Sequence, residues 1–220
     1  MKFWKLVTVA SVIMASSSVN AALLSRLDGM AFYDDAADLT WLADADYANG
    51  QMTWDQANTW AAGLNVGGVN GWRLANTVDV GNDGETFTNL SQGVDTGYNI
   101  TTHSELSNMF YNVLGNTAKY DINGVETGCT APNFCLSNTG PFSNLRSDYY
   151  WSATEYAVDA DYAWGFGMDD GGQGKIAKST RLYAWAVQSG DVSAVPVPAA
   201  VWLFGSGLIG LAGLAKRKKA

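Results

Sequence analysis

Two segments of the chain carry apolar residues at every third or fourth position, a pattern typical of amphipathic helices. The first runs from Trp54 to Leu64, and Thr53 to Gln56 at its start match a capping box. The second runs from Leu106 to Leu114, and Thr102 to Glu105 match the same motif. We therefore predict one helix in each segment, both with a threonine before the first turn.

Alternation of large and small residues with a period of two predicts strands in the last third of the chain. Large side chains occupy every second position in Tyr162–Met168, and the same alternation recurs in Leu182–Gln188. Asp169–Gly172 follows the first of these segments with residues that favour a turn. Shorter extended segments are predicted at Leu23–Leu27, Met30–Tyr33, Asp38–Leu42, Gly71–Leu74 and Tyr149–Thr154.

Two long stretches show no such periodicity. Val78–Ile100 is polar and rich in glycine, and Lys119–Leu145 contains both cysteines of the chain. We predict long loops in both. Strands, two helices, long loops and a final antiparallel sheet together predict an α+β domain.

The C-terminal end has a different pattern. An apolar run from Ala199 to Ala215 contains no charged residue and is followed by the basic residues Lys216, Arg217, Lys218 and Lys219. Its seventeen residues are near the lower limit for a membrane-spanning helix. A buried core helix is the alternative, but such a helix usually has a polar face. We therefore expect a transmembrane helix with its basic end in the cytoplasm.

The N-terminal end matches a secretory signal peptide. Lys2 and Lys5 precede an apolar centre, and Val19-Asn20-Ala21 is a small-residue cleavage site. Cleavage after Ala22 is the alternative. The predicted organisation is a signal peptide at 1–21, an exported domain at 22–194 and a sorting tail at 195–220.

The charge of the predicted exported domain limits its partners. Six of the thirteen basic residues lie in the two ends, whereas all twenty-one acidic residues lie between them, which leaves a net charge of −14. Nucleic-acid binding needs a basic surface and is therefore not expected. A strongly acidic domain is compatible with cation binding, or simply with solubility outside the cell.

Two cysteines and one histidine restrict the chemistry. Cys129 and Cys135 are six positions apart, and outside the cytoplasm such a pair is expected to form a disulfide. A zinc site would need further ligands. His103 is the only histidine, and we expect it to be a solvated residue in the first turn of the second helix. No catalytic triad is therefore visible.

Calcium is the one candidate cofactor. Asp44, Asp46 and Asn49 approach the spacing of a calcium loop, and Asp55 stands at the twelfth position. Ala48 occupies a position that should offer an oxygen. Asp55 is also explained as an acidic residue at a helix N-terminus.

Tryptophans are frequent and could stack on carbohydrate. Their positions fit a buried core, so burial is the expectation for each, and an exposed one would suggest a binding surface. Those in the predicted exported domain are Trp41, Trp54, Trp60, Trp72, Trp151, Trp164 and Trp185.

The tail resembles the PEP-CTERM sorting signal. The resemblance rests on Val195, Pro196, Val197 and Pro198, the apolar run and the basic end. It implies the secretion machinery and an exosortase-type membrane protease as partners, with cleavage near the motif. Val197 stands where the name-giving motif has Glu, which makes the cleavage position uncertain.

Five stretches of the domain carry a further resemblance: Asp38–Ala45, Gly71–Leu74, Ser104–Leu106, Tyr150–Glu155 and Tyr183–Val187. In this order they resemble the Lcl C-terminal family of collagen-like adhesins, over about residues 23–192. The resemblance implies a C-type-lectin-like fold with two helices, small antiparallel sheets and long loops. Family members usually have Pro where this chain has Ala75, and often Arg-Pro-Gly where it has Gln188–Gly190.

These observations predict a non-enzymatic surface or extracellular-matrix protein. It would be exported across the inner membrane, anchored by its C-terminal helix and then placed at the cell surface or outside the cell. The alternative is a module that binds carbohydrate or another extracellular polymer, with or without calcium. An enzyme ranks last, because no catalytic set is visible.

Overall fold

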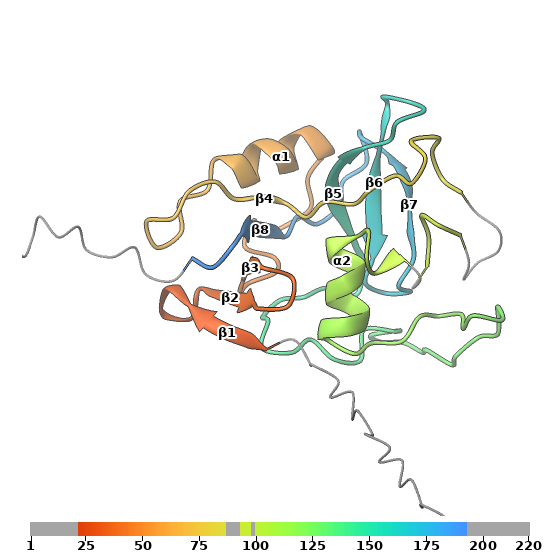
Figure 1. The fold of residues 1–220 in the computed structure, drawn as a ribbon, viewed down its shortest axis with the longest axis horizontal. Coiled ribbons are helices and arrows are strands. Elements are labelled where there is room, and N and C mark those ends of the chain that lie inside the picture. The colour runs from red at the N-terminus through yellow and green to blue at the C-terminus, as the bar shows by residue number, and fades with distance from the viewer. Residues whose placement is uncertain (1–21, 87–92, 98–99, 193–220) are drawn as a thin grey trace, which may run out of the picture.

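The computed structural model describes residues 22–86, 93–97 and 100–192. Within them the chain forms two antiparallel sheets and two short helical segments (Figure 1). The first sheet has the strand order β1-β2-β3-β8-β4, and the second has the order β5-β6-β7. The strands are β1 Leu23–Arg26, β2 Ala31–Asp34, β3 Leu39–Leu42, β4 Arg73–Leu74, β5 Tyr149–Glu155, β6 Tyr162–Gly167, β7 Gln173–Ala177 and β8 Ala186–Ser189.

The first sheet joins the two ends of the described chain. A 3-10 turn, η1 (Leu27–Gly29), links β1 to β2, which lie at the two extended segments predicted at Leu23–Leu27 and Met30–Tyr33. Strand β8 lies between β3 and β4, so Val187 pairs with both Trp41 and Arg73. The last strand of the chain is therefore held on both sides by strands from its first third.

The second sheet contains the predicted alternating strand. Strand β6 is central, and both its large residues and its small residues are buried, apart from the half-buried Tyr162. A Cβ atom at Gly165 would lie 2.7 Å from Ile176 and 3.4 Å from Leu182, so only glycine fits there without movement of its neighbours. Strand β7, which begins after the predicted turn at 169–172, was not predicted from the sequence.

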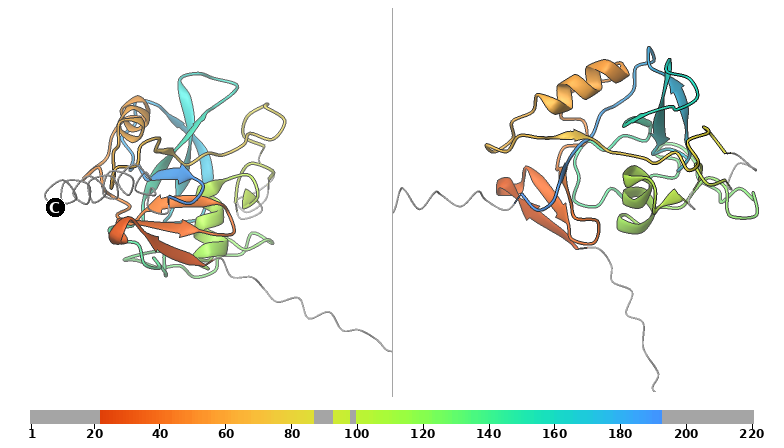
Figure 2. Two further views of the ribbon diagram at one scale, coloured as in Figure 1. Left: turned by 60° about the vertical axis from the view of Figure 1, so that its left-hand side comes forward. Right: turned by 45° about the horizontal axis from the view of Figure 1, so that its top comes forward.

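Helix α1 (Trp54–Ala62) confirms the first predicted helix. The Gln56 side chain accepts a hydrogen bond from the Thr53 N–H at 3.1 Å, as a capping box requires. The helix lies beside β4 and β5 (Figures 1 and 2) and buries only Ala57 and Ala61 completely.

The second helix differs from the prediction in its start and its form. It consists of α2 (Glu105–Asn108) and a π-helical segment, η3 (Met109–Val113). Its N-cap is Ser104, whose hydroxyl accepts from the Ser107 N–H at 3.2 Å, so the predicted capping box at 102–105 is wrong. The physical reason is that the Glu105 carboxylate binds Arg73 instead. His103 is exposed as predicted, but it lies before the first turn rather than within it.

Tryptophan side chains dominate the core. Trp41, Trp72, Trp151, Trp164 and Trp185 are all at most 2% exposed, which confirms the expected burial for five of the seven. Trp185 contacts Trp41 at 4.7 Å between ring centroids and donates its indole N–H to the Leu42 carbonyl. Trp54 and Trp60, both on α1, are only partly buried.

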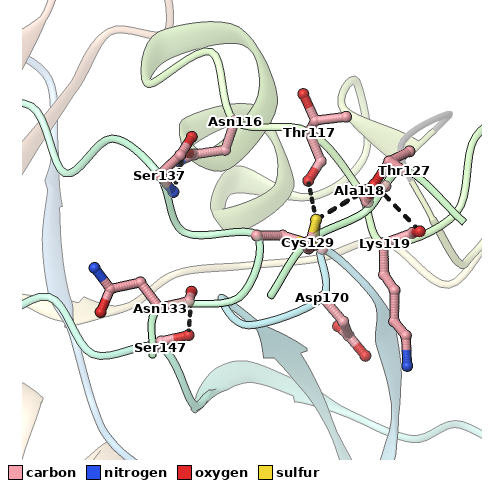
Figure 3. The surroundings of a disulfide bond; sticks show 12 residues. Asn116, Thr117, Ala118, Lys119, Thr127, Cys129, Asn133, Ser137, Ser147 and Asp170 are labelled. Carbon is pink, nitrogen blue, oxygen red and sulfur yellow. Dashed lines mark hydrogen bonds between the residues drawn. A yellow bond between two sulfur atoms is a disulfide. The ribbon is translucent and has the colours of Figure 1, made fainter. Parts of the chain in front are cut away.

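Long loops occupy the described parts of 78–100 and most of 119–145, as predicted. The second loop is closed by the disulfide between Cys129 and Cys135, which confirms the pairing expected from the sequence. Figure 3 shows Cys129 beside Thr117 and Thr127, while the Cys135 N–H donates to the Asp169 carbonyl. The disulfide therefore holds this loop next to the turn between β6 and β7.

Two parts of the predicted fold class need correction. The domain is mostly β-sheet with two short helical segments, so it fits an α+β class only loosely, and the C-type-lectin-like assignment with two full helices is not retained. No helix in the described ranges is long and apolar enough to cross a membrane. The longest α-helix there, α1, has nine residues, whereas a span needs roughly 20.

The predicted transmembrane segment at 199–215 lies outside the described residues, as do the signal peptide and the sorting tail. We therefore withdraw the transmembrane helix from the description of the fold. The membrane anchor and the surface localisation that depended on it are withdrawn as well.

Candidate functional site

An open groove of about 680 Å³ lies between the start of α1 and the segment that leads into β8. Most of its wall comes from a single stretch, residues 48–52, which connects β3 to α1. The remaining wall comes from α1 and from residues 181–183. The lining residues are Ala48, Asn49, Gly50, Gln51, Met52, Gln56, Trp60, Arg181 and Tyr183.

Backbone pairing fixes the inner end of this wall. Met52 and Leu182 exchange two backbone hydrogen bonds of 2.9 and 3.0 Å, which join the 48–52 stretch to the 181–183 segment. The Trp151 indole N–H also donates to the Met52 carbonyl at 2.9 Å. Because Trp151 is fully buried, the floor of the groove is anchored directly to the core.

Two aromatic side chains face the groove. Trp60 projects from α1 and is partly exposed, in contrast to the five buried tryptophans. Tyr183 is half-buried, and its ring packs against that of Tyr150 at 5.6 Å with a tilt of 34°. The packing holds Tyr183 in place. The groove therefore has one aromatic ring fixed by the core, that of Tyr183, and one partly exposed ring, that of Trp60.

Arg181 supplies the positive charge. Its guanidinium donates to the Gln51 carbonyl at 2.5 Å. Of the seven basic side chains in the described ranges, Arg181 alone has neither an acidic partner nor an aromatic ring contact. Its remaining donors are therefore available to a ligand.

The lining offers hydrogen-bonding groups to a polar ligand. Asn49, Gln51 and Gln56 provide amide donors and acceptors, and Arg181 adds a guanidinium. The groove can thus hold a ligand that carries hydroxyl, amide or carboxylate groups.

The residues predicted to bind calcium serve other purposes. The Asp44 carboxylate accepts from the Asp46 N–H and from the Asn144 side chain. Asp46 forms an ion pair with Arg146 and accepts from the Gly50 N–H. Both carboxylates are thus occupied by the loop itself and by its neighbour.

Asn49 and Asp55 line different depressions, the first the groove and the second a pocket of about 730 Å³ with Asp159 and Asp161. No group of three or more His, Cys, Asp and Glu side chains in the described part of the chain is placed to hold a metal ion. The structure therefore does not bring Asp44, Asp46 and Asp55 together as a metal site.

Two pKa values near the groove are shifted by its surroundings. Burial raises the pKa of the Tyr150 hydroxyl, which remains protonated and accepts from the Arg146 N–H at 2.8 Å. The hydrogen bond to Asp46 raises the pKa of the Arg146 guanidinium. Both groups therefore keep a single charge state across the physiological pH range.

The sorting residues predicted from the sequence, Val195–Pro198 and Lys216–Lys219, lie outside the described residues. The groove was missed because its wall is a loop without a motif and its parts lie more than a hundred residues apart. One usable signal was Trp60, a tryptophan on a helix whose fully buried residues are alanines.

The fold and the groove define a disulfide-closed, β-rich domain with an open groove beside α1. The chain matches the Lcl C-terminal domain over residues 30–188, and it belongs to that family. No curated protein matches the chain. The matched range contains the whole groove.

Proposed function

We propose that the protein is an exported, non-enzymatic, adhesin-like protein that binds a carbohydrate polymer in the groove. Membership of the Lcl C-terminal domain family supports the adhesin-like role. The disulfide between Cys129 and Cys135 supports an oxidising compartment outside the cytoplasm. The observation that carries the proposal is the groove itself, in which Trp60 and Arg181 are both accessible.

The lining matches the chemistry of a sugar chain. A flat apolar face of a sugar ring packs against an aromatic side chain such as Trp60. The amides of Asn49, Gln51 and Gln56 can hydrogen-bond to hydroxyl groups. The Arg181 guanidinium can bind hydroxyl or carboxylate oxygens. Because the groove is open rather than closed, it can accept an internal segment of a long polymer as well as its end.

The test is binding of the purified protein to a panel of soluble polysaccharides: alginate, dextran and hydroxyethyl cellulose. We expect calorimetry to detect at least one of them, and Trp60→Ala to weaken that binding about tenfold or more, as loss of a central aromatic contact does. Tyr47→Ala is the matched control, because Tyr47 is 48% exposed but does not line the groove. No binding by the wild type, or equal losses in both variants, would reject the proposal.

We also propose that residues 195–220 act as a PEP-CTERM-like sorting tail for an exosortase-type protease. Support for this comes from the sequence alone, through the Val195–Pro198 motif, the apolar run at 199–215 and the basic residues Lys216–Lys219. Mass spectrometry of the mature protein from its native host is the measurement. We expect a mature chain that ends near Pro198; a mature chain that still carries Lys216–Lys219 would contradict the proposal.

A further inference from the structure

We infer that Asp46, held by Arg146, is the positioning residue of the groove. The inference rests on the proposed function and adds to it the residue that fixes the shape of the binding surface. Asp46 does not line the groove, although five of the nine lining residues follow it within six positions of the chain.

One carboxylate makes two different connections. Its Oδ1 accepts from the Gly50 N–H at 2.8 Å, across the turn that it starts. Its Oδ2 accepts from Nη2 and Nε of Arg146 at 3.1 and 3.3 Å. The first bond closes the loop on itself, and the second ties the loop to a segment one hundred residues away.

The loop closed by Asp46 turns through two residues with positive φ. Asn49 has φ = 56° and Gly50 has φ = 138°. Glycine adopts such a conformation without steric cost and asparagine at little cost, so both residues suit the turn. The Asn49 N–H donates to the Asp46 carbonyl at 2.7 Å and the Gly50 N–H donates to the Asp46 carboxylate, so Asp46 holds both residues of the turn.

Burial explains why Arg146 is needed. The Asp46 side chain is 7% exposed, whereas that of Arg146 is 49% exposed. A carboxylate this deeply buried is stable in its charged form only with a partner. Arg146 therefore offsets the loss of hydration at the Asp46 carboxylate, and the Arg146 backbone is fixed by the hydroxyl of the buried Tyr150.

The arrangement implies a preorganised wall. Asn49, Gly50 and Gln51 are held in place before the ligand arrives, so less conformational freedom is lost on binding. Without the Asp46 side chain the loop would keep its bonds at Gln51 and Met52 but lose its closure at Gly50 and its connection to Arg146. Affinity should then fall even though no contact with the ligand has been removed.

A graded series of variants tests this inference. Asp46→Asn keeps an oxygen for the Gly50 N–H but loses the charge that binds Arg146, whereas Asp46→Ala loses both. We expect the dissociation constant for the best-bound panel polysaccharide to rise about tenfold in Asp46→Ala. Asp46→Asn and Arg146→Gln should each give a smaller rise, and their combination should be less than additive because the two residues form one pair.

The matched control is Arg26→Gln. It breaks the ion pair between Arg26 and Asp191, which involves no groove residue, and should leave the dissociation constant unchanged. All affinities are measured well below the melting temperature of each variant, so that loss of folded protein does not mimic loss of binding. Hydrogen exchange of the Gly50 amide reports directly on the loop and should be faster in Asp46→Ala.

The outcomes separate this inference from the proposed function. If the wild type binds and the Asp46 variants bind equally well, the inference is wrong and the binding function stands. Faster hydrogen exchange at Gly50 without a change in the dissociation constant would also reject the inference and leave the binding function standing. If the wild type binds none of the panel, the proposed function fails and the inference fails with it.

Discussion

Helix α1 and the segment formed by α2 and η3 begin in different ways. In α1 the polar side chain of the first turn, Gln56, bonds back to the Thr53 N–H. In α2 the side chain that the sequence motif places in the same role, Glu105, is the first helical residue after the N-cap Ser104 and binds outside its own helix. It forms two bonds of 2.7 and 2.8 Å to Arg73 and accepts the Asn76 N–H at 2.7 Å.

This difference between Gln56 and Glu105 follows from charge, and it affects what each helix contributes to the molecule. A neutral amide has no stronger partner nearby, whereas a carboxylate gains more from a bidentate guanidinium than from one N–H. Helix α1 is thus determined locally and leaves Gln56 and Trp60 at the groove. The α2–η3 segment is determined by the rest of the fold and places Leu106, Met109 and Phe110 in the core.

The largest expected difference between the two helices is in the free energy of unfolding that each loses when an aromatic side chain is removed. Phe110 in η3 is fully buried and contacts the rings of Tyr111 and Phe166 at 4.8 and 5.7 Å. We expect Phe110→Ala to lower the free energy of unfolding by about 3–5 kcal/mol, because it leaves a cavity. Trp60→Ala removes a larger but partly exposed side chain and should cost about 1 kcal/mol or less. Urea denaturation followed by circular dichroism measures both, and similar losses would contradict the division.

The acidic residue in the first turn of each helix gives the next comparison. Glu105→Ala leaves Arg73 and the Asn76 N–H without their partner, and we expect a loss of about 2–3 kcal/mol. Asp55→Ala, the matched change in the exposed first turn of α1, should cost only about 0.3–1 kcal/mol through the helix dipole. The same denaturation experiment distinguishes them, and a larger loss for Asp55→Ala would overturn the comparison.

The N-cap of α2 gives the smallest and most local comparison. Ser104→Ala removes the acceptor for the Ser107 N–H and should cost about 1 kcal/mol. Thr102→Ala changes the exposed residue that the sequence motif selects, and we expect an effect within about 0.5 kcal/mol. Thermal melting of the two variants side by side checks this. If Thr102→Ala were the more harmful change, the helix would begin where the motif places it.

The spacing of apolar residues and the positions of turn-forming residues predicted most of the helices and strands. The alternation of large and small residues in 162–168 located β6, and the apolar residues at every third or fourth position in 54–64 located α1. Strand β7 was missed, since Gln173, Gly174 and Lys175 carry no alternation and are defined by pairing with β6. The second capping motif failed for the related reason that Arg73, a distant residue, competes for Glu105.

The site was harder to predict than the fold. Asp44 and Asp46 were recognised as functional candidates from their spacing, but spacing does not reveal that Asn144 and Arg146 occupy them. Arg181 had no local signal at all, because its importance comes from the absence of an acidic partner in the described surroundings. Pairing of distant segments therefore decided the chemistry of each carboxylate and of the groove.

The groove lies close in the chain to the C-terminal limit of the described domain, and this affects how the domain would bear force. Strand β8 follows Arg181 and Tyr183 directly and is hydrogen-bonded to β3 and β4 on its two sides. A pull between a polymer in the groove and residue 192 would load β8 along its length, so that bonds on both sides must break together. The Gly190 N–H, bound to the Asp38 carbonyl, adds to that resistance. Helix α1 would share this load, because Gln56 and Trp60 line the groove, whereas the α2–η3 segment contributes no lining residue and would be left undisturbed.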